Sequence, residues 1–232
     1  MIDIVIISYS ANAELKRQTE NALDSLFKSE KNSLSIFNVI VVESQEDVNW
    51  DSYPNTKTYY PPKPYGYHKF LNFGRKLGNN SFVCLCNNDL IFNDRWASNI
   101  LKFIQYNPEA YSFSPICPKT QPIYGIFPDS GNYMGYEIRK QISGWCIFQR
   151  RSIYDKIGDL DERFTHWFCD NDYALTLYTK SIPHYLITSS VVEHHEMNVG
   201  KTGPAVLSQE EMWRYTSGSE PIFTEKWRST SQ

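Results

Sequence analysis

The sequence predicts an α/β protein in which a mostly parallel central sheet is flanked by helices. Near-continuous apolar runs at residues 3–8, 37–42 and 82–86 have the length and pattern of strands that are buried on both faces. Apolar residues at helical spacing follow the first run, and Asn12 before them is a typical helix N-cap. Strand, helix and strand in this order predict the opening of a βαβ unit, whose two strands are parallel.

Later segments continue this alternation. Helical spacing predicts helices over residues 68–77, 93–107, 151–157 and 170–180, and apolar runs predict strands over 142–149 and 184–192. The stretch 115–136 is rich in Pro, Gly and Tyr and has little periodicity, so we expect an irregular connection there. Beyond Glu196 the chain turns polar, which favours a flexible lid or tail.

Composition narrows the class of protein. The chain has 232 residues, of which 41% are hydrophobic and 15% aromatic, enough for the core of one domain. A net charge of −3 gives no bulk attraction for nucleic acid or anionic lipid. No apolar run reaches the roughly 18 residues of a membrane span, and no secretory leader is visible, so we expect a cytoplasmic protein. The five cysteines form no C-x-x-C pair, which favours buried free thiols over disulfides or zinc.

Polar residues follow three of the predicted strands directly. They are Ser8, Tyr9 and Ser10 after the first, Glu43 and Ser44 after the second, and Asn87, Asn88 and Asp89 after the third. Ligands of open α/β sheets bind outside the carboxyl ends of the strands, so we expect these side chains to share one edge. No glycine-rich dinucleotide or phosphate loop follows the first strand. A carboxylate at the end of a buried strand fits a divalent cation, although Asn and Asp are also ordinary turn residues.

A series of segments resembles, in order, the motifs of glycosyltransferase family 2, the inverting enzymes of the GT-A fold. They are residues 4–9, residues 39–44, Gly66 and Tyr67 with Asn72, Phe73 and Gly74, residues 85–89, and Ser143 and Gly144 followed by residues 160–164 and 168–172. The resemblance covers residues 1–199. It implies a single Rossmann-like nucleotide-sugar-binding domain, with residues 1–110 as the donor half, 111–199 as the acceptor half and 200–232 as a C-terminal lid or tail.

The resemblance also implies roles for individual residues. Those implied to bind the nucleotide sugar are Ser8, Tyr9, Glu43, Asn72, Asn87 and Asn88. Asp89 and His194, with His195 as the fallback, are implied to bind Mn²⁺ or Mg²⁺, and Asp170 is implied to be the general base. Trp145 and Asp172 are implied to bind the acceptor, and orientation of the region around the base is the alternative role for Asp172. Asp170 and Asp172 open a predicted helix, where backbone N–H groups stabilise carboxylates, and helix capping alone would also explain them.

The sequence departs from the family pattern at three places. Asn87 replaces the first acid of the metal motif, so fewer carboxylates would hold the ion. Cys169 stands where Glu is usual beside the base. The 115–136 segment has no counterpart, and its tyrosines suit either acceptor recognition or an ordinary surface loop.

The expected activity is therefore metal-dependent transfer of a sugar from a UDP-, dTDP- or GDP-linked donor to an acceptor hydroxyl. A carbohydrate of a surface polysaccharide is the first acceptor we expect, and a modified DNA base is the second. Two other interpretations stay open at this stage. The chain could be an inactive sugar-nucleotide or glycan-binding module, which Asn87 and Cys169 favour, or a nucleotidyltransferase, which would normally show a glycine-rich, lysine-bearing loop after the first strand.

Overall fold

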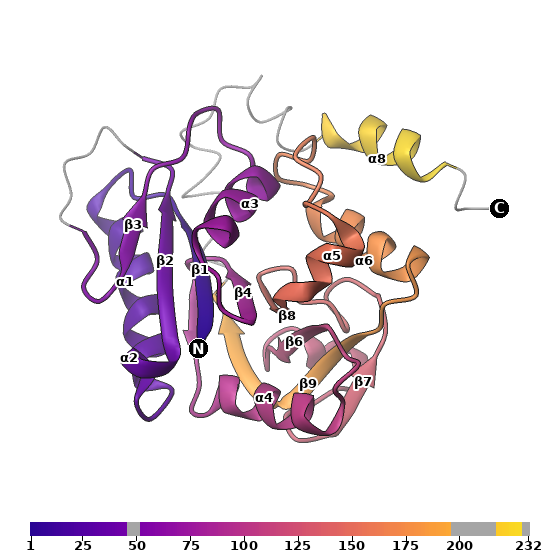
Figure 1. Cartoon of the computed structure of the whole chain (residues 1–232), viewed down its shortest axis with the longest axis horizontal. Helices are drawn as coiled ribbons and strands as arrows, with labels where there is room; N and C mark the ends of the chain where they lie inside the picture. Colours follow the sequence, from indigo (N-terminus) through magenta and orange to yellow (C-terminus); the bar gives the residue numbers. More distant parts are fainter. Residues whose placement is uncertain (46–51, 196–216, 229–232) are drawn as a thin grey trace.

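The computed structural model describes residues 1–45, 52–195 and 217–228. One sheet runs through the molecule in the order β3-β2-β1-β4-β8-β6-β9-β5, and β7 pairs with β9 (Figure 1). Its strands are β1 (Ile2–Ser8), β2 (Phe37–Glu43), β3 (Lys57–Tyr59), β4 (Phe82–Cys86), β5 (Leu90–Phe92), β6 (Ser112–Ile116), β7 (Asn132–Met134), β8 (Cys146–Arg150) and β9 (His184–His194). This architecture confirms the predicted α/β class with helices on both sides of a central sheet.

The strand directions decide which residues meet. Strands β1, β2 and β4 are parallel, as predicted, and β3 is parallel to β2. Strand β8 is antiparallel to both β4 and β6. Strand β9 is parallel to β6, and β5 and β7 run antiparallel to it, so the second half of the sheet is mixed. The carboxyl ends of β1, β2, β4 and β9 therefore lie at the same edge as the beginning of β8. We call this the carboxyl edge, and the opposite edge the amino edge.

The helices predicted from the sequence are present close to their expected positions, together with others that were not predicted. They are α1 (Ala13–Lys28), α2 (Ser33–Ile36), α3 (Tyr67–Leu77), α4 (Trp96–Tyr106), α5 (Tyr154–Ile157), α6 (Cys169–Thr179) and α8 (Ser219–Trp227), with single 3-10 turns η1 (Gln121–Tyr124) and η2 (Arg151–Ile153). Asn12 caps α1 as expected, because its Oδ1 accepts a hydrogen bond of 3.0 Å from the amide of Leu15. Of the predicted lid or tail, residues 200–216 and 229–232 lie outside the described residues, and the described part contains α8.

Burial on both faces explains the continuous apolar runs. On β1, Ile4 and Ile6 pack into one core layer, with α1 and α4, whereas Val5 and Ile7 pack into the other, with α3 and α6. Because successive strand residues point to opposite faces, both sets must be apolar. Among the described residues, no helix combines the length and hydrophobicity needed to cross a bilayer.

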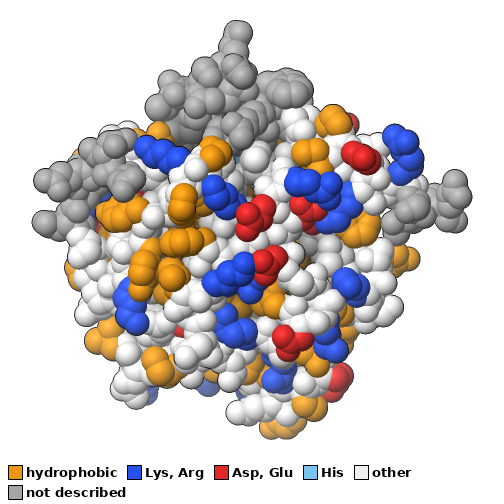
Figure 2. Space-filling model, turned by 45° about the horizontal axis from the view of Figure 1, so that its top comes forward, with side chains coloured by type: hydrophobic (Ala, Val, Ile, Leu, Met, Phe, Trp, Pro, Cys, Tyr) orange, Lys and Arg blue, Asp and Glu red, His pale blue; other side chains and the backbone are white. Residues whose placement is uncertain are grey.

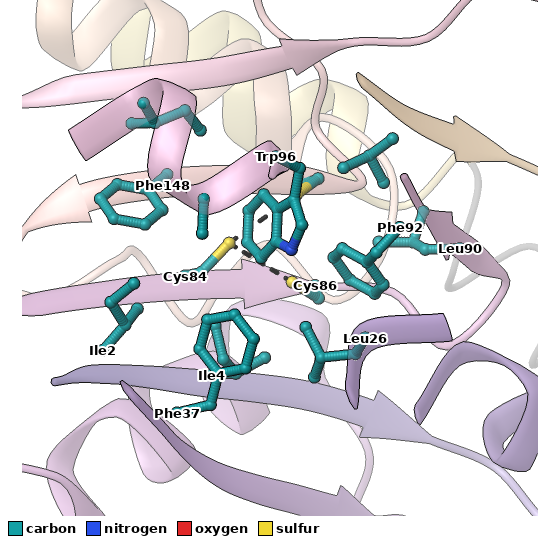
Figure 3. Close-up of a cluster of buried hydrophobic side chains, with 14 of the residues drawn as sticks. Ile2, Ile4, Leu26, Phe37, Cys84, Cys86, Leu90, Phe92, Trp96 and Phe148 are labelled. Atoms are coloured by element: carbon teal, nitrogen blue, oxygen red, sulfur yellow. Dashed lines mark hydrogen bonds between the residues drawn. The ribbon is translucent and has the colours of Figure 1, made fainter. Parts of the chain in front are cut away.

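All five cysteines are buried and free, as predicted. Cys84, Cys86 and Cys146 lie together in the first core layer, where Cys84 Sγ is 3.4 Å from Cys86 Sγ and 3.7 Å from Cys146 Sγ (Figure 3). Their neighbours include Ile4, Leu26, Phe92, Trp96 and Phe148. Three thiols so close together have the spacing of a soft-metal site, but charged thiolates are costly in apolar surroundings, so we interpret the group as core packing.

Candidate active site at the carboxyl edge

The ends of β1 and β2 form a buried cluster of hydroxyl groups. Ser8 Oγ lies 2.8 Å from Thr19 Oγ1, 3.2 Å from Ser10 Oγ and 3.3 Å from Tyr53 OH. Burial disfavours the phenolate and raises the pKa of Tyr53, so its hydroxyl stays protonated and able to donate. Ser8 lies at the expected place, whereas Thr19 and Tyr53 join the cluster from segments that the strand-end argument did not consider.

Glu43 is held in this cluster with one oxygen saturated and the other not. Its Oε1 accepts from the amides of Ser10 and Gln45 at 3.0 and 2.9 Å. Among the described residues, its Oε2 has only a long contact of 3.4 Å, with Tyr53 OH. Because a carboxylate oxygen has more than one acceptor position, Oε2 keeps capacity for a donor group from a ligand. Tyr9, which is half-buried, follows Ser8 at the same edge.

The two asparagines after β4 face different neighbours. Asn88 Nδ2 donates to Thr19 Oγ1 at 2.9 Å, and its Oδ1 accepts from Gln18 at 3.2 Å. The bond to Thr19 connects Asn88 to the Ser8 cluster. Asn87 Oδ1 accepts a bond of 2.7 Å from Tyr67 OH. The structure therefore brings Ser8, Glu43 and Asn88 into one hydrogen-bonded network, with Asn87 beside it on the side of α3.

Asn72 does not join this network. Its Nδ2 donates to the carbonyl of Leu160 at 2.8 Å, and its Oδ1 accepts from the amide of Leu160 at 3.1 Å. Its Nδ2 also reaches Glu162 at 3.0 Å. The structure thus differs from the expected contact with the nucleotide sugar, because the amide of Asn72 fastens the 160–162 loop to α3. Amide groups suit both roles, so the sequence could not separate them.

Asp89 and His194 lie side by side although 105 positions separate them in the chain. Residue 194 ends β9 and pairs with Leu90 at the start of β5, so Asp89 Oδ2 lies 3.2 Å from His194 Nε2. The ring of Trp145 stacks on His194 at 4.7 Å between centroids and an interplanar angle of 2°. His195 instead points toward Glu193 and Lys119. Of the two histidines, it is His194 that the structure brings to Asp89.

Two buried atoms of this pair have no hydrogen-bond partner among the described residues. They are Asp89 Oδ1 and His194 Nδ1. An unsatisfied buried polar atom is costly, which makes this pair a candidate for a ligand that is not a side chain. Carboxylate and imidazole ligands fit Mn²⁺ well and Mg²⁺ through the oxygen, so the residues present fit the expected ion.

Asp170 lies in the first turn of α6 and packs against Gly144. A Cβ atom on residue 144 would come within 2.9 Å of Asp170 Cβ and 3.0 Å of its Oδ2, so only glycine permits this approach. Burial raises the pKa of Asp170, although the amide of Asn171, at 3.0 Å from Oδ1, and the charge of Arg139 lower it in part. A partly desolvated carboxylate of this kind is suited to accept a proton.

The adjacent residues Gly144 and Trp145 connect Asp170 to the Asp89–His194 pair. Gly144 contacts Asp170, and Trp145 covers His194. Tyr67 OH lies 2.7 Å from Asn87 Oδ1 and 3.2 Å from the carbonyl oxygen of Gly144, which fixes this segment to the end of β4. A cavity of about 20 Å³, room for about one water molecule, adjoins Asp170. It is lined by residues that include Tyr67, Leu85, Gly144, Cys169 and Asp170.

The two residues expected to contact the acceptor are both engaged within the chain. Asp172 is 3% exposed, and its carboxylate binds Lys226 and Trp227 of α8. Trp145 is 8% exposed and covers His194 with one face of its ring. The structure therefore differs from the expectation for Asp172, because α8 occupies both of its oxygens. For Trp145 it indicates support of the Asp89–His194 pair.

Comparison with known proteins identifies the fold. No protein-family model and no curated protein sequence matches the chain. Among solved structures, S. aureus TarS 1–349 aligns with a TM-score of 0.61 at 13% identity over 82% of this chain and 59% of that chain. GalNAc-T7 with UDP, GalNAc and Mn²⁺ aligns with a TM-score of 0.68 at 10% identity over 95% of this chain and 48% of that chain. The chain thus has the GT-A fold and spans roughly half the length of these proteins.

Proposed function

We propose that this chain is a metal-dependent, inverting glycosyltransferase that moves a sugar from a nucleoside diphosphate to an acceptor hydroxyl. The observation that carries the proposal is the convergence of the Asp89–His194 pair and Asp170 on neighbouring residues, Gly144 and Trp145. The GT-A fold and the neighbour GalNAc-T7, whose structure holds UDP and Mn²⁺, support it. We assign residues 1–110 to the donor half and 111–199 to the acceptor half.

In this proposal the network at the ends of β1 and β2 holds the nucleoside. Glu43 Oε2 has acceptor capacity for a ribose or base donor. Tyr9 lies between Ser8 and Ser10, two members of the same network. Asn88 extends the network toward Asp89, where the diphosphate would lie. Asp89 and His194 would hold Mn²⁺ or Mg²⁺, which when bound neutralises charge on the departing diphosphate. A UDP-, dTDP- or GDP-linked sugar fits this arrangement.

Asp170 acts on the acceptor. Its carboxylate takes the proton of the acceptor hydroxyl while that oxygen attacks the anomeric carbon, and the bond from this carbon to the diphosphate oxygen breaks on the opposite face. One displacement inverts the anomeric configuration. Burial raises the pKa of Asp170, which makes the carboxylate a stronger base than an exposed aspartate. Asn87 and Cys169 do not remove these groups, so the departures from the family pattern leave the chemistry possible.

We propose a carbohydrate, such as a surface polysaccharide, as the acceptor. On the face in Figure 2, basic and acidic side chains of the described residues are interspersed, and the net charge is −3. A DNA acceptor would require a basic surface to neutralise phosphates. These charges therefore give a modified DNA base no support.

The test is release of nucleoside diphosphate from a panel of UDP-, dTDP- and GDP-sugars with Mn²⁺ and a pool of glycan acceptors. Asp170→Asn should lower turnover by about 10²- to 10⁴-fold, because it removes general-base catalysis, while donor affinity measured by calorimetry stays the same. Asp155→Asn, an exposed carboxylate of α5, is the matched control and should keep wild-type turnover.

The other outcomes separate the alternatives. Pyrophosphate release would indicate a nucleotidyltransferase. Saturable donor binding without turnover, unchanged in Asp170→Asn, would indicate a binding module. Equal loss of donor affinity and turnover in Asp170→Asn would contradict the role of base.

A further inference from the structure

Helix α8 binds two carboxylates that come from different segments of the acceptor half. Lys226 Nζ lies 2.9 Å from Asp161 Oδ2 and 2.8 Å from Asp172 Oδ1. Trp227 Nε1 donates to Asp172 Oδ1 at 2.9 Å. Arg163 also binds Asp161, at 2.7 Å. One ammonium group at the end of α8 therefore joins the loop before α6 to the first turn of α6.

Apolar contacts accompany these ion pairs. The ring of Phe223 lies 4.9 Å from that of Phe168 and 6.3 Å from that of Phe164. Lys226 Nζ lies 5.6 Å from the centroid of the Phe164 ring. Since Asp172 is only 3% exposed, its ion pair with Lys226 is shielded from solvent and less weakened by salt than a surface pair.

The first turn of α6 lacks a side-chain cap of its own. Phe168 occupies the N-cap position with a φ of 66°, in the left-handed region, and no side chain caps the helix. A residue other than glycine rarely adopts this conformation by its own backbone preference, so contacts with the surrounding protein must hold Phe168 in it. Helix α8 contacts this turn on both sides of Asp170 in sequence, at Phe168 and at Asp172. On its other side, Asp170 rests against Gly144.

We propose that Lys226 is a positioning residue that clamps the first turn of α6, so that the Asp170 carboxylate keeps the orientation required of the base. The proposal rests on the function proposed above and adds the C-terminal helix to the machinery. Asp172 is then the anchor of α8 and not a contact for the acceptor. Lys226 itself touches neither donor nor acceptor, and its effect reaches the reaction through Asp172 and the helix turn.

The test compares Lys226→Met, Lys226→Arg and Trp227→Phe with Lys102→Met, an exposed lysine of α4 that serves as the matched control. Turnover at saturating donor should fall about 10- to 100-fold in Lys226→Met, since small misplacements of a reacting group have costs of this size. Affinities for the donor and for Mn²⁺ should stay within about twofold, because Lys226 pairs with Asp161 and Asp172 and not with the residues proposed to hold the donor and the ion. Lys226→Arg should restore most of the turnover, because guanidinium can bind both carboxylates. Trp227→Phe should lower it less, and Lys102→Met should not change it.

Amide hydrogen exchange provides a readout that needs no activity. Residues 169–172 should exchange faster in Lys226→Met, whereas the amides of β1 and β2 should not change, which separates a local release from general unfolding. Wild-type turnover in Lys226→Met, or unchanged exchange at residues 169–172, would overturn the clamp. A wild-type chain that turns over no donor, while residues 169–172 still loosen in Lys226→Met, would count against the proposed function and leave the clamp standing.

Discussion

Strand β9 carries a histidine at each end, and the two differ in how fully they are bound. At the amino edge, His184 Nδ1 lies 2.8 Å from Ser112 Oγ, and its Nε2 lies 3.1 Å from the carbonyl oxygen of Gln141. Both ring nitrogens are therefore satisfied inside the protein. At the carboxyl edge, His194 Nε2 meets Asp89, and its buried Nδ1 has no partner among the described residues.

The aspartates repeat this contrast. Asp3, at the beginning of β1, accepts from Asn38 and from both nitrogens of Asn80, and it pairs with Arg151. Burial alone would raise the pKa of Asp3, but these hydrogen bonds and the charge of Arg151 outweigh it and lower the pKa below its ordinary value. Asp89, at the other edge, keeps a buried oxygen without a partner in the described chain.

Burial of charged or polar side chains thus has two meanings in one sheet. Where the protein supplies every partner, as around Asp3 and His184, the group stabilises the fold. Where one atom has no partner among the described residues, as in Asp89 and His194, we propose that the site binds a ligand. This division agrees with the rule that ligands of α/β sheets bind at the carboxyl ends of strands.

The largest effect should come from the amino edge, where the protein supplies every partner of Asp3. Asp3→Ala leaves Arg151 and the Asn80 donors without their buried acceptor, which should lower the free energy of unfolding by about 3–5 kcal/mol in urea denaturation. The folded fraction should keep its turnover and its Mn²⁺ affinity. Asp24→Ala is the control, because its pair with Lys28 is exposed and such pairs contribute at most about 1 kcal/mol. If Asp3→Ala lowers the free energy of unfolding as little as Asp24→Ala does, the contrast between the two edges of the sheet is wrong.

At the carboxyl edge, substitutions should weaken ligand binding and leave the stability of the fold nearly unchanged. Asp89→Ala and His194→Ala should each weaken Mn²⁺ binding, measured by electron paramagnetic resonance, on the order of 100-fold or more. Loss of a residue that only hydrogen-bonds to a metal ligand already lowers metal affinity by about 10- to 100-fold. The free energy of unfolding should change by less than about 1 kcal/mol, because neither side chain is fully satisfied in the fold. His195→Ala is the matched control and should bind Mn²⁺ like the wild type. Equal losses for the two histidines would contradict the assignment.

Local patterns were sufficient to predict the framework. The apolar runs of β1, β2 and β4 were evident because both faces of these strands are buried, and Asn12 marked the beginning of α1. Polar residues at strand ends then led to the carboxyl edge. Strand β6 was less evident, because its Ser-Phe-Ser-Pro-Ile lacks a clear period, and α8 lies beyond the segments that carry the resemblance.

Other contacts between distant segments could not be predicted. Tyr53 lies 45 positions from Ser8, and no local pattern links the two residues. The resemblance implied an acceptor contact for Asp172. Its partner Lys226 is 54 positions away, and no local pattern links the two residues. The resemblance pointed to the charged residues of the candidate site. The coordinates were needed to show which of these residues are already paired within the chain.

The smallest predicted effect sharpens the comparison at His184 through pH. Burial disfavours the imidazolium and lowers the pKa of His184 to about 3 in the folded protein. In the unfolded chain, histidine takes up a proton below about pH 6.5. The folded state therefore loses stability as the pH falls from about 6.5 toward 3, and the contribution of His184 is fully present only above this range. Between pH 7 and pH 5, the expected loss from this residue is about 2 kcal/mol.

Urea denaturation of the wild type and His184→Gln at pH 8, 7 and 5 measures this contribution. The two proteins should differ in stability by a constant amount between pH 8 and pH 7, where histidine is neutral in both states, and the difference should shrink by about 2 kcal/mol at pH 5. His68, which is also buried with a lowered pKa, is present in both proteins and cancels in the subtraction. If the difference stays constant down to pH 5, His184 is protonated in the folded protein as readily as in the unfolded chain. The amino edge would then not be saturated, and the contrast with His194 would have to be abandoned.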